Sequence, residues 1–181
     1  SEAENEIVLE DLIERHNAVI TLTHTGYIKR QPEDTYSAQR RGGKGIIGMA
    51  TKEEDYIERV VVADSHSHIL FFTTRGRVHA IKAYRVPEAG RTAKGSNIVN
   101  VLDGLEPEEG ISAMLSVKGL ETGEGLENQF VVMVTRHGVI KRTALAEFVM
   151  QRRGGKIALS LDDDDELVFA ALTHGTSDVM I

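Results

Sequence analysis

Short runs of β-branched and apolar residues recur along the whole chain. They lie at 19–23, 59–63, 69–73, 111–117, 130–135 and 167–172, and most are bounded by Gly, Asp, His or Ser. Runs of this length between turn residues are typical of β-strands. Residues 2–15 are the best candidate for a helix, although 7–9 within them fit a strand equally well. The pattern predicts an all-β fold of many short strands.

The runs belong to an internal repeat marked by Gly26, Gly76 and Gly138. Threonine stands three residues before each glycine, and Ile or Val stands two residues after it. A segment that carries Arg, Lys and two or three Gly begins thirteen residues after each glycine. We call these segments the first, second and third box segments: 39–45, 89–95 and 151–157. No gaps are needed to align this window, so the repeat is a strong signal.

About four strands in each ~50 residues is the size of one propeller blade. We therefore expect a propeller-like fold with three four-stranded blades, at about 16–63, 64–129 and 130–172. Residues 178–181 resemble the first strand of another unit, so we expect an orphan strand there and interpret the chain as part of a longer protein.

Composition narrows the chemistry. The 181 residues include no Cys, which excludes disulfides and thiolate metal sites. The apolar runs are far shorter than the ~20 residues that cross a bilayer, and no signal peptide is visible. The formal net charge of −7 would by itself argue against nucleic-acid binding.

The positions of the charges reverse that interpretation. We define three basic windows from the repeat: 24–52, 75–95 and 136–156. They hold 18 of the 21 Lys and Arg but only 4 of the 28 Asp and Glu. Equivalent positions of a blade repeat fall on equivalent surfaces, so the windows predict a basic rim on an otherwise acidic protein. Such a rim attracts a polyanion.

The first box segment has the chemistry of a phosphate site. Its three cations supply charge, Gly42 and Gly43 let backbone N–H groups approach an anion, and Gln39 can hydrogen-bond a sugar or phosphate. No aromatic residue is interleaved, so base stacking is not expected. The plain alternative is that the two glycines only form a loop.

The chain resembles the C-terminal DNA-wrapping domain of the A subunit of bacterial DNA gyrase over essentially its whole length. Residues 39–45, Gln-Arg-Arg-Gly-Gly-Lys-Gly, match the family's box at every position, and the repeat around the three glycines also fits. The resemblance implies a partial β-pinwheel over 1–181, about three blades of a six-bladed disc. It also implies sequence-tolerant binding and wrapping of duplex DNA on the blade rim, which supports negative supercoiling.

The resemblance and the charges together give the expected DNA-binding residues. They are Gln39, Arg40, Arg41, Gly42, Gly43, Lys44 and Gly45, with Lys29, Arg30, Arg75, Arg77, Lys82, Arg85, Arg91, Lys94, Arg136, Lys141, Arg142, Arg152, Arg153 and Lys156. The third box segment departs from the family at Ile157, and the second keeps only Gly90, Arg91, Lys94 and Gly95. The related domain of the topoisomerase IV A subunit is the alternative, but its first box is typically degraded.

The resemblance also implies a non-catalytic module of an ATP-hydrolysing type II topoisomerase. The parent is expected to use ATP and Mg, whereas this part needs no cofactor or metal. Expected partners are duplex DNA, the rest of the gyrase A subunit and the gyrase B subunit, in the bacterial cytoplasm at the nucleoid and away from membranes. A homodimer that completes a six-bladed disc is a further hypothesis.

Two other function classes are weaker. A protein-interaction propeller predicts exposed aromatic or Met-rich hot spots, and only 5% of the residues are aromatic, with no Trp. An enzyme in its own right needs a convergent polar site, and none of the four Tyr has one. His66 and His68 lack a third metal ligand at suitable spacing, and the acidic run 162–166 is typical of a solvated loop.

Overall fold

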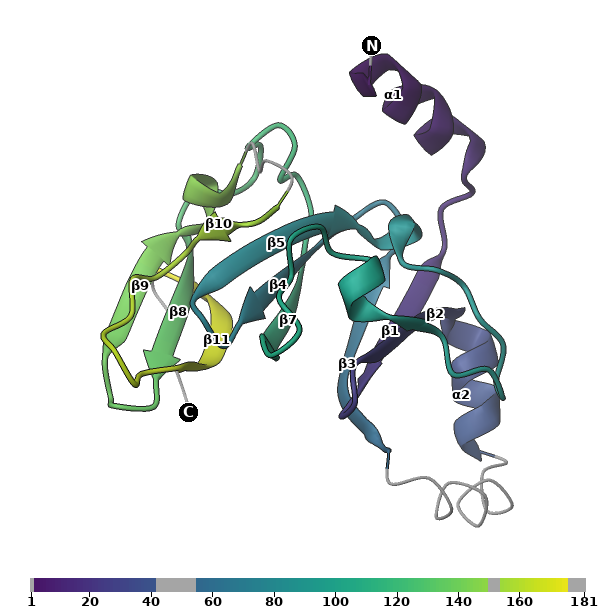
Figure 1. Ribbon diagram of the computed structural model, residues 1–181. Coiled ribbons are helices and arrows are strands. Elements are labelled where there is room, and N and C mark those ends of the chain that lie inside the picture. Colours follow the sequence, from purple (N-terminus) through teal and green to yellow (C-terminus); the bar gives the residue numbers. More distant parts are fainter. Residues whose placement is uncertain (1, 42–54, 150–153, 176–181) are drawn as a thin grey trace. The chain divides into compact units, whose positions relative to one another are not determined.

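The structure, a computed structural model, describes residues 2–41, 55–149 and 154–175 (Figure 1). The chain divides into two compact units. Unit 1 comprises Ser1–Ser67 with Lys82–Asn97, and unit 2 comprises His68–Ile81 with Ile98–Ile181. Among the described residues, unit 1 holds one β-sheet and unit 2 holds two. Within the described residues, no helix is long and apolar enough to cross a membrane.

One four-stranded antiparallel sheet forms unit 1, in the order β3-β1-β2-β6. Its strands are β1 (Asn17–Thr23), β2 (Tyr27–Pro32), β3 (Ile57–Asp64) and β6 (Ser96–Asn97). The central strand β1 lies between β3 and β2, and it is buried from Ala18 to Leu22. Ile20 lies opposite Arg30 of β2 and opposite Val61 of β3.

Helices add to the sheet of unit 1. They are α1 (Glu2–Leu12), α2 (Glu33–Arg41) and the 3-10 helix η1 (Ala83–Arg85). The ambiguous stretch at 2–15 is thus helical from Glu2 to Leu12. Residues 33–41 form α2, which the pattern of apolar runs does not predict. Glu33 and Asp34 in its first turn complement the partial positive charge of a helix N-terminus, a signal that the hydrophobic pattern does not carry.

Unit 2 contains two antiparallel sheets, in the orders β10-β5-β4-β7 and β11-β8-β9. Their strands are β4 (His68–Thr73), β5 (Arg77–Lys82), β7 (Ile111–Val117), β8 (Gln129–Thr135), β9 (Ile140–Ala144), β10 (Lys156–Ile157) and β11 (Leu167–His174); the 3-10 helices are η2 (Ile98–Asn100) and η3 (Leu145–Phe148). Side chains of both sheets form one core, in which Phe72 and Phe148 meet edge to face at 5.8 Å. The hydroxyl of Ser112 on β7 also donates to the carbonyl of Leu167 on β11.

Two short strands extend the sheet of the preceding repeat. β6 follows the second box segment and pairs with β2 through Ile28 and Ser96. β10 ends the third box segment and pairs with β5 through Val78 and Lys156. A box segment therefore lies at the sheet edge of the repeat before it. The blade bounds inferred above stay a prediction, and the expected orphan strand at 178–181 lies outside the described residues.

All six predicted strand runs are confirmed. They fall within β1, β3, β4, β7, β8 and β11. The third sheet has three strands among the described residues, where four are expected.

Candidate nucleic-acid interface

The glycine that marks each repeat lies in the turn between two paired strands. Gly26, Gly76 and Gly138 have φ of +96°, +76° and +88°, which side chains disfavour. The threonine hydroxyl three residues earlier accepts a backbone N–H four residues further on, at 3.1 to 3.2 Å: Thr23 from Tyr27, Thr73 from Arg77 and Thr135 from Val139. This Thr–Gly pair forms the turn and is not itself a binding feature.

A carboxylate from the acidic stretch of the repeat holds the same turn. Asp55 accepts the backbone N–H and hydroxyl of Thr25 at 3.0 and 2.6 Å, and Asp165 accepts the N–H of His137 at 3.0 Å. The acidic run 162–166 does lie in a loop, between β10 and β11, and 162–164 are exposed, but the Asp165 side chain is only 2% exposed. Part of the acidic charge is therefore structural. Sequence reasoning missed this signal, a carboxylate that follows the turn glycine by 29 residues at Asp55 and by 27 at Asp165.

In the second repeat, the carboxylate of Glu109 also binds a cation of the basic windows. Its side chain is fully buried, and it accepts Arg77 Nη2 at 2.6 Å, Arg77 Nε at 3.0 Å and the Thr73 hydroxyl at 2.6 Å. Burial would raise the pKa of Glu109, but these hydrogen bonds and the Arg77 charge hold it below its ordinary value. The guanidinium of Arg77 is committed to this pair and to the carbonyls of Gly104 and Gly154.

Arg75 and Arg136, beside the second and third Gly turns, also face acids. Arg75 pairs with Glu106 and, at 2.8 Å, with Glu108, while Arg136 Nη2 lies 2.5 Å from Glu166. All these side chains are exposed. Exposed pairs contribute only about 0–1 kcal/mol, so a phosphate can replace any of these acids at small cost.

Lys29 on β2 faces the second box segment. Its ammonium donates to the carbonyls of Gly90, Arg91 and Ala93 at 3.0, 3.2 and 3.1 Å. Burial lowers the pKa of Lys29. The three bonds hold the loop that carries Arg91 and Lys94.

Arg30 and Lys82 have their hydrogen bonds inside unit 1. Arg30 Nε donates to the carbonyl of Val86 at 3.0 Å. Lys82 is buried and donates to Glu10 at 3.1 Å and to the carbonyl of His66 at 3.0 Å. Neither side chain offers its full set of donors to solvent.

The described part of the third box segment rests on β5. A Cβ on Gly155 would lie 2.8 Å from Nε2 of His79, so the ring packs directly on that glycine. His79 is buried, and burial, then the charge of Arg77, lowers its pKa. Lys156 Nζ donates to the carbonyl of Glu147 at 2.7 Å.

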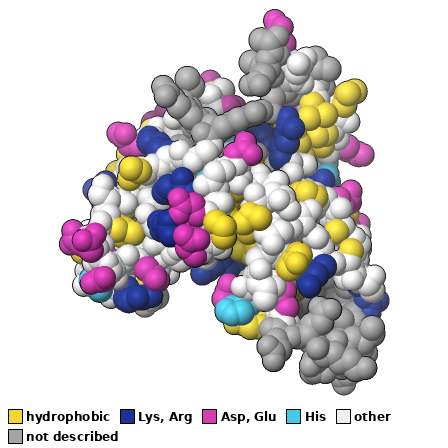
Figure 2. Space-filling model, in the orientation of Figure 1, with side chains coloured by type: hydrophobic (Ala, Val, Ile, Leu, Met, Phe, Trp, Pro, Cys, Tyr) yellow, Lys and Arg dark blue, Asp and Glu magenta, His cyan; other side chains and the backbone are white. Residues whose placement is uncertain are grey.

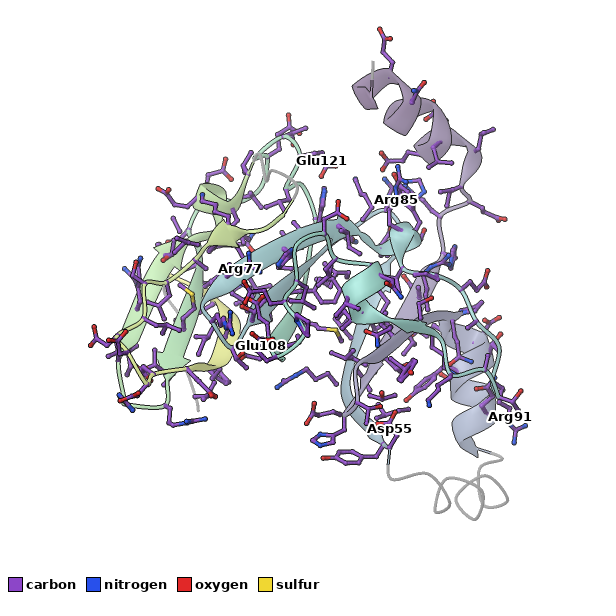
Figure 3. All side chains as sticks on the ribbon, in the orientation of Figure 1. Asp55, Arg77, Arg85, Arg91, Glu108 and Glu121 are labelled. Atoms are coloured by element: carbon purple, nitrogen blue, oxygen red, sulfur yellow. The ribbon has the colours of Figure 1, made fainter. Side chains whose placement is uncertain are left out.

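Among the predicted cations, Arg91, Lys94, Lys141 and Arg142 have exposed side chains. Arg91 points away from the loop before β6 (Figure 3). Lys94 lies 4.4 Å from the ring centroid of Tyr27, and Arg142 lies 4.2 Å from that of Phe130. Aromatic faces hold these two cations without neutralising them.

Acidic side chains interrupt the basic ones. On the face shown in Figure 2, Lys and Arg of each unit lie beside Asp and Glu. The exposed Arg85 lies 5.9 Å from the ring centroid of Tyr84. Among the described residues, no group of three His, Asp or Glu could hold a metal ion.

The first box segment is described only at its start. Gln39, Arg40 and Arg41 lie in α2, and the Gln39 side-chain oxygen accepts from the Gln31 amide at 3.1 Å. The other predicted contacts of the first and third box segments lie outside the described residues: Gly42, Gly43, Lys44, Gly45, Arg152 and Arg153.

Comparison with known proteins gives a consistent family. The sequence model of the family described as "DNA gyrase C-terminal domain, beta-propeller" matches residues 17–64, 67–118 and 129–174. The DNA gyrase A subunit of Clostridium acetobutylicum is 50% identical over 179 residues, which cover 99% of this chain and 21% of that protein. The DNA gyrase A subunit of Staphylococcus aureus strain NCTC 8325 is 49% identical over 172 residues, 95% of this chain and 19% of that protein. The chain spans about a fifth of the length of these relatives.

Two solved structures share the fold. The crystal structure of the C-terminal domain of DNA topoisomerase IV has a TM-score of 0.69 and 24% identity, over 90% of this chain and 47% of that one. The structure of the DNA gyrase A C-terminal domain has a TM-score of 0.60 and 19% identity, over 88% of this chain and 48% of that one. They confirm the predicted all-β, propeller-like fold class.

Proposed function

Because the chain belongs to the DNA gyrase C-terminal domain family, we propose that it binds duplex DNA and wraps it along the basic windows. The binding is tolerant of sequence, since Lys and Arg contact phosphates, which are the same in every sequence. Wrapping supports negative supercoiling by the parent topoisomerase. Smooth bending of a short duplex costs on the order of 1–6 kcal/mol, which additional phosphate contacts offset.

The observation that carries the proposal is the outward set of cations in the second and third repeats. Arg91, Lys94, Lys141 and Arg142 are exposed, and no described carboxylate forms an ion pair with any of them. They lie in the second and third basic windows, and the family model matches each of the three repeats separately. Arg75 and Arg136, beside the second and third Gly turns, are exposed and form only weak ion pairs, so they are a second set of cations that DNA recruits.

The parent protein is the finer part of the proposal. We infer a gyrase rather than a topoisomerase IV, because relatives at 50% and 49% identity are gyrase A subunits. The proposed partners are the rest of the A subunit and the B subunit, in an enzyme that uses ATP and Mg at the bacterial nucleoid in the cytoplasm. This chain's own part is DNA binding, without a catalytic residue.

A homodimer is a separate proposal. The chain matches 47–48% of each solved domain, and the β9 edge of the third sheet has no further strand among the described residues, unlike β2 and β5. Two copies would together supply the length of one disc. Light scattering at high concentration tests it, and a monomer mass there would exclude the dimer.

The DNA proposal is tested by titrating a fluorescent linear duplex at several salt concentrations. Affinity should fall steeply with salt, and each of Arg91→Ala and Lys94→Met should make the log–log slope shallower by about one unit. Lys118→Met is the matched control, because Lys118 is exposed but lies outside the basic windows. Affinity that does not change with salt would refute phosphate binding.

Wrapping needs a separate measurement. Nicked circles ligated around the bound protein should carry writhe of one consistent sign after the protein is removed. Arg40/Arg41→Ala, in the first box segment, should reduce that writhe. Binding without any shift in linking number would separate DNA binding from wrapping and refute the latter.

A further inference from the structure

Lys29 belongs to the basic windows, but its surroundings differ from those of the outward cations. A lysine ammonium has three N–H donors and no acceptor. Carbonyl oxygens of Gly90, Arg91 and Ala93 take up all three, at 3.0, 3.2 and 3.1 Å. No donor remains for a phosphate unless this set of bonds opens.

The same bonds give the second box segment its shape. Three carbonyl dipoles that converge on one point repel one another, and a cation at that point offsets the repulsion. The end of the segment is also fixed to β2, since Gly95 has φ of +93° and a Cβ there would lie 2.4 Å from the carbonyl oxygen of Ile28. With its carbonyls turned inward to Lys29, the loop presents Arg91 and Lys94 to solvent.

Unit 2 repeats this arrangement with different residues. His79 occupies the repeat position of Lys29, three residues after the Gly turn, and packs on Gly155 of the third box segment. Arg77, two residues before it on β5, donates to the carbonyl of Gly154 at 3.3 Å. In both described cases, the second strand of one repeat holds the box segment of the next.

We propose that Lys29 is a positioning residue for DNA binding, which shapes the second box segment so that Arg91 and Lys94 reach phosphates and does not contact phosphate itself. The proposal rests on the proposed DNA-binding function. It assigns the cations of the basic windows to two roles. Lys29 stabilises the loop from inside, whereas Arg91 and Lys94 act from outside.

Lysine acylation of the unmodified chain, followed by mass spectrometry, tests this without any variant. Lys29 should label slowly with and without duplex DNA, whereas Lys94 should label quickly alone and slowly with DNA. Burial lowers the pKa of Lys29, which by itself would speed acylation, so slow labelling reports its hydrogen bonds. Lys118 is the control that should label quickly in both states.

The two possible failures are distinguishable. If Lys29 labels quickly alone and becomes protected only with DNA, it is a direct phosphate contact and the positioning role is wrong. If DNA changes the labelling of neither Lys29 nor Lys94, the proposed DNA-binding function fails, and the positioning role fails with it.

A charge-conserving variant gives an independent test. Lys29→Arg keeps the positive charge, but a planar guanidinium cannot direct its donors at three carbonyls around one point. We expect it to weaken DNA binding by about tenfold, the cost of roughly one charge-assisted hydrogen bond. The salt slope should also fall although the net charge is unchanged. DNA affinity and salt slope equal to those of the unmodified chain would overturn the proposal.

A double-mutant cycle completes the test. In an Arg91→Ala, Lys94→Met background, Lys29→Arg should change DNA affinity by less than about twofold, because the residues that it positions are gone. A full tenfold loss in that background would overturn the proposal. Unfolding curves of each variant confirm that unit 1 remains folded.

Discussion

Removal of the Glu109 carboxylate is the sharpest test of the fold. Glu109→Ala leaves Arg77, the Thr73 hydroxyl and the backbone N–H of Glu106 without their buried acceptor. Glu109 is fully buried, but Arg77 is 26% exposed, so water can solvate part of the guanidinium.

The expected loss follows from that burial. Removing one partner of a buried ion pair costs about 3–5 kcal/mol, because the other charge stays desolvated. The partial exposure of Arg77 favours the lower limit, about 3 kcal/mol. For a chain of this size, each kcal/mol lowers Tm by about 2–4 °C, so we expect a fall of about 6–12 °C.

Urea unfolding measures this loss, with hydrogen exchange of β4, β5 and β7 to assign it to unit 2. Glu108→Ala is the matched control, since Glu108 pairs with Arg75 in solvent and should cost about 0–1 kcal/mol. If Glu109→Ala costs no more than Glu108→Ala, the buried pair does not stabilise the fold as argued.

Three further predictions concern unit 2. Gly76→Ala should destabilise unit 2 more than Gly138→Ala. Both glycines have positive φ, but only a Cβ at Gly76 would meet a backbone atom, the carbonyl oxygen of Leu159 at 2.4 Å. Urea unfolding should give a loss of about 1–2 kcal/mol for Gly138→Ala and a larger loss for Gly76→Ala. Phe148→Ala should cost about 3–5 kcal/mol in the same assay, because Phe148 is 1% exposed and packs on Phe72. The pKa of His79 is lower in the folded chain than in the unfolded chain, so as pH falls His79 is protonated first in the unfolded chain. The free energy of unfolding should therefore fall as pH drops below about 6.5. His79→Gln should lessen that pH dependence.

The strands could be predicted from the sequence because their signal is local. Each predicted run is rich in apolar and β-branched residues, most are bounded by turn residues, and each lies within a strand. The helix α2 could not, because its sequence has few apolar residues and its start depends on Glu33 and Asp34. Nor does any local pattern show that β6 and β10 pair with the preceding repeat, since that depends on contacts distant in sequence.

Repeat positions predicted the cations of the site but not their roles. Lys29, His79 and Lys141 are equivalent in the repeat, yet Lys29 binds carbonyls, His79 is buried and Lys141 is exposed. The sequence shows which residues are charged. Whether a charged side chain holds a loop, is buried or faces solvent depends on which groups of the following box segment lie beside it. A carboxylate such as Glu109 can change that role, and its register with Arg77 was not apparent from spacing alone.

Because some cations of the basic windows are committed within the fold, the DNA affinity should depend less on salt than the number of cations suggests. If every Lys and Arg of the basic windows contacted phosphate, the log–log slope would reflect 18 cations. Lys29, Arg77 and Lys82 have donors committed within the fold, and the duplex must first displace acids from Arg75 and Arg136. The log–log slope should therefore be well below the value for 18 cations. The double variant Glu106→Gln, Glu108→Gln should make the slope steeper, because Arg75 then binds phosphate without losing an ion pair. An unchanged slope in that double variant would show that Arg75 does not contact DNA.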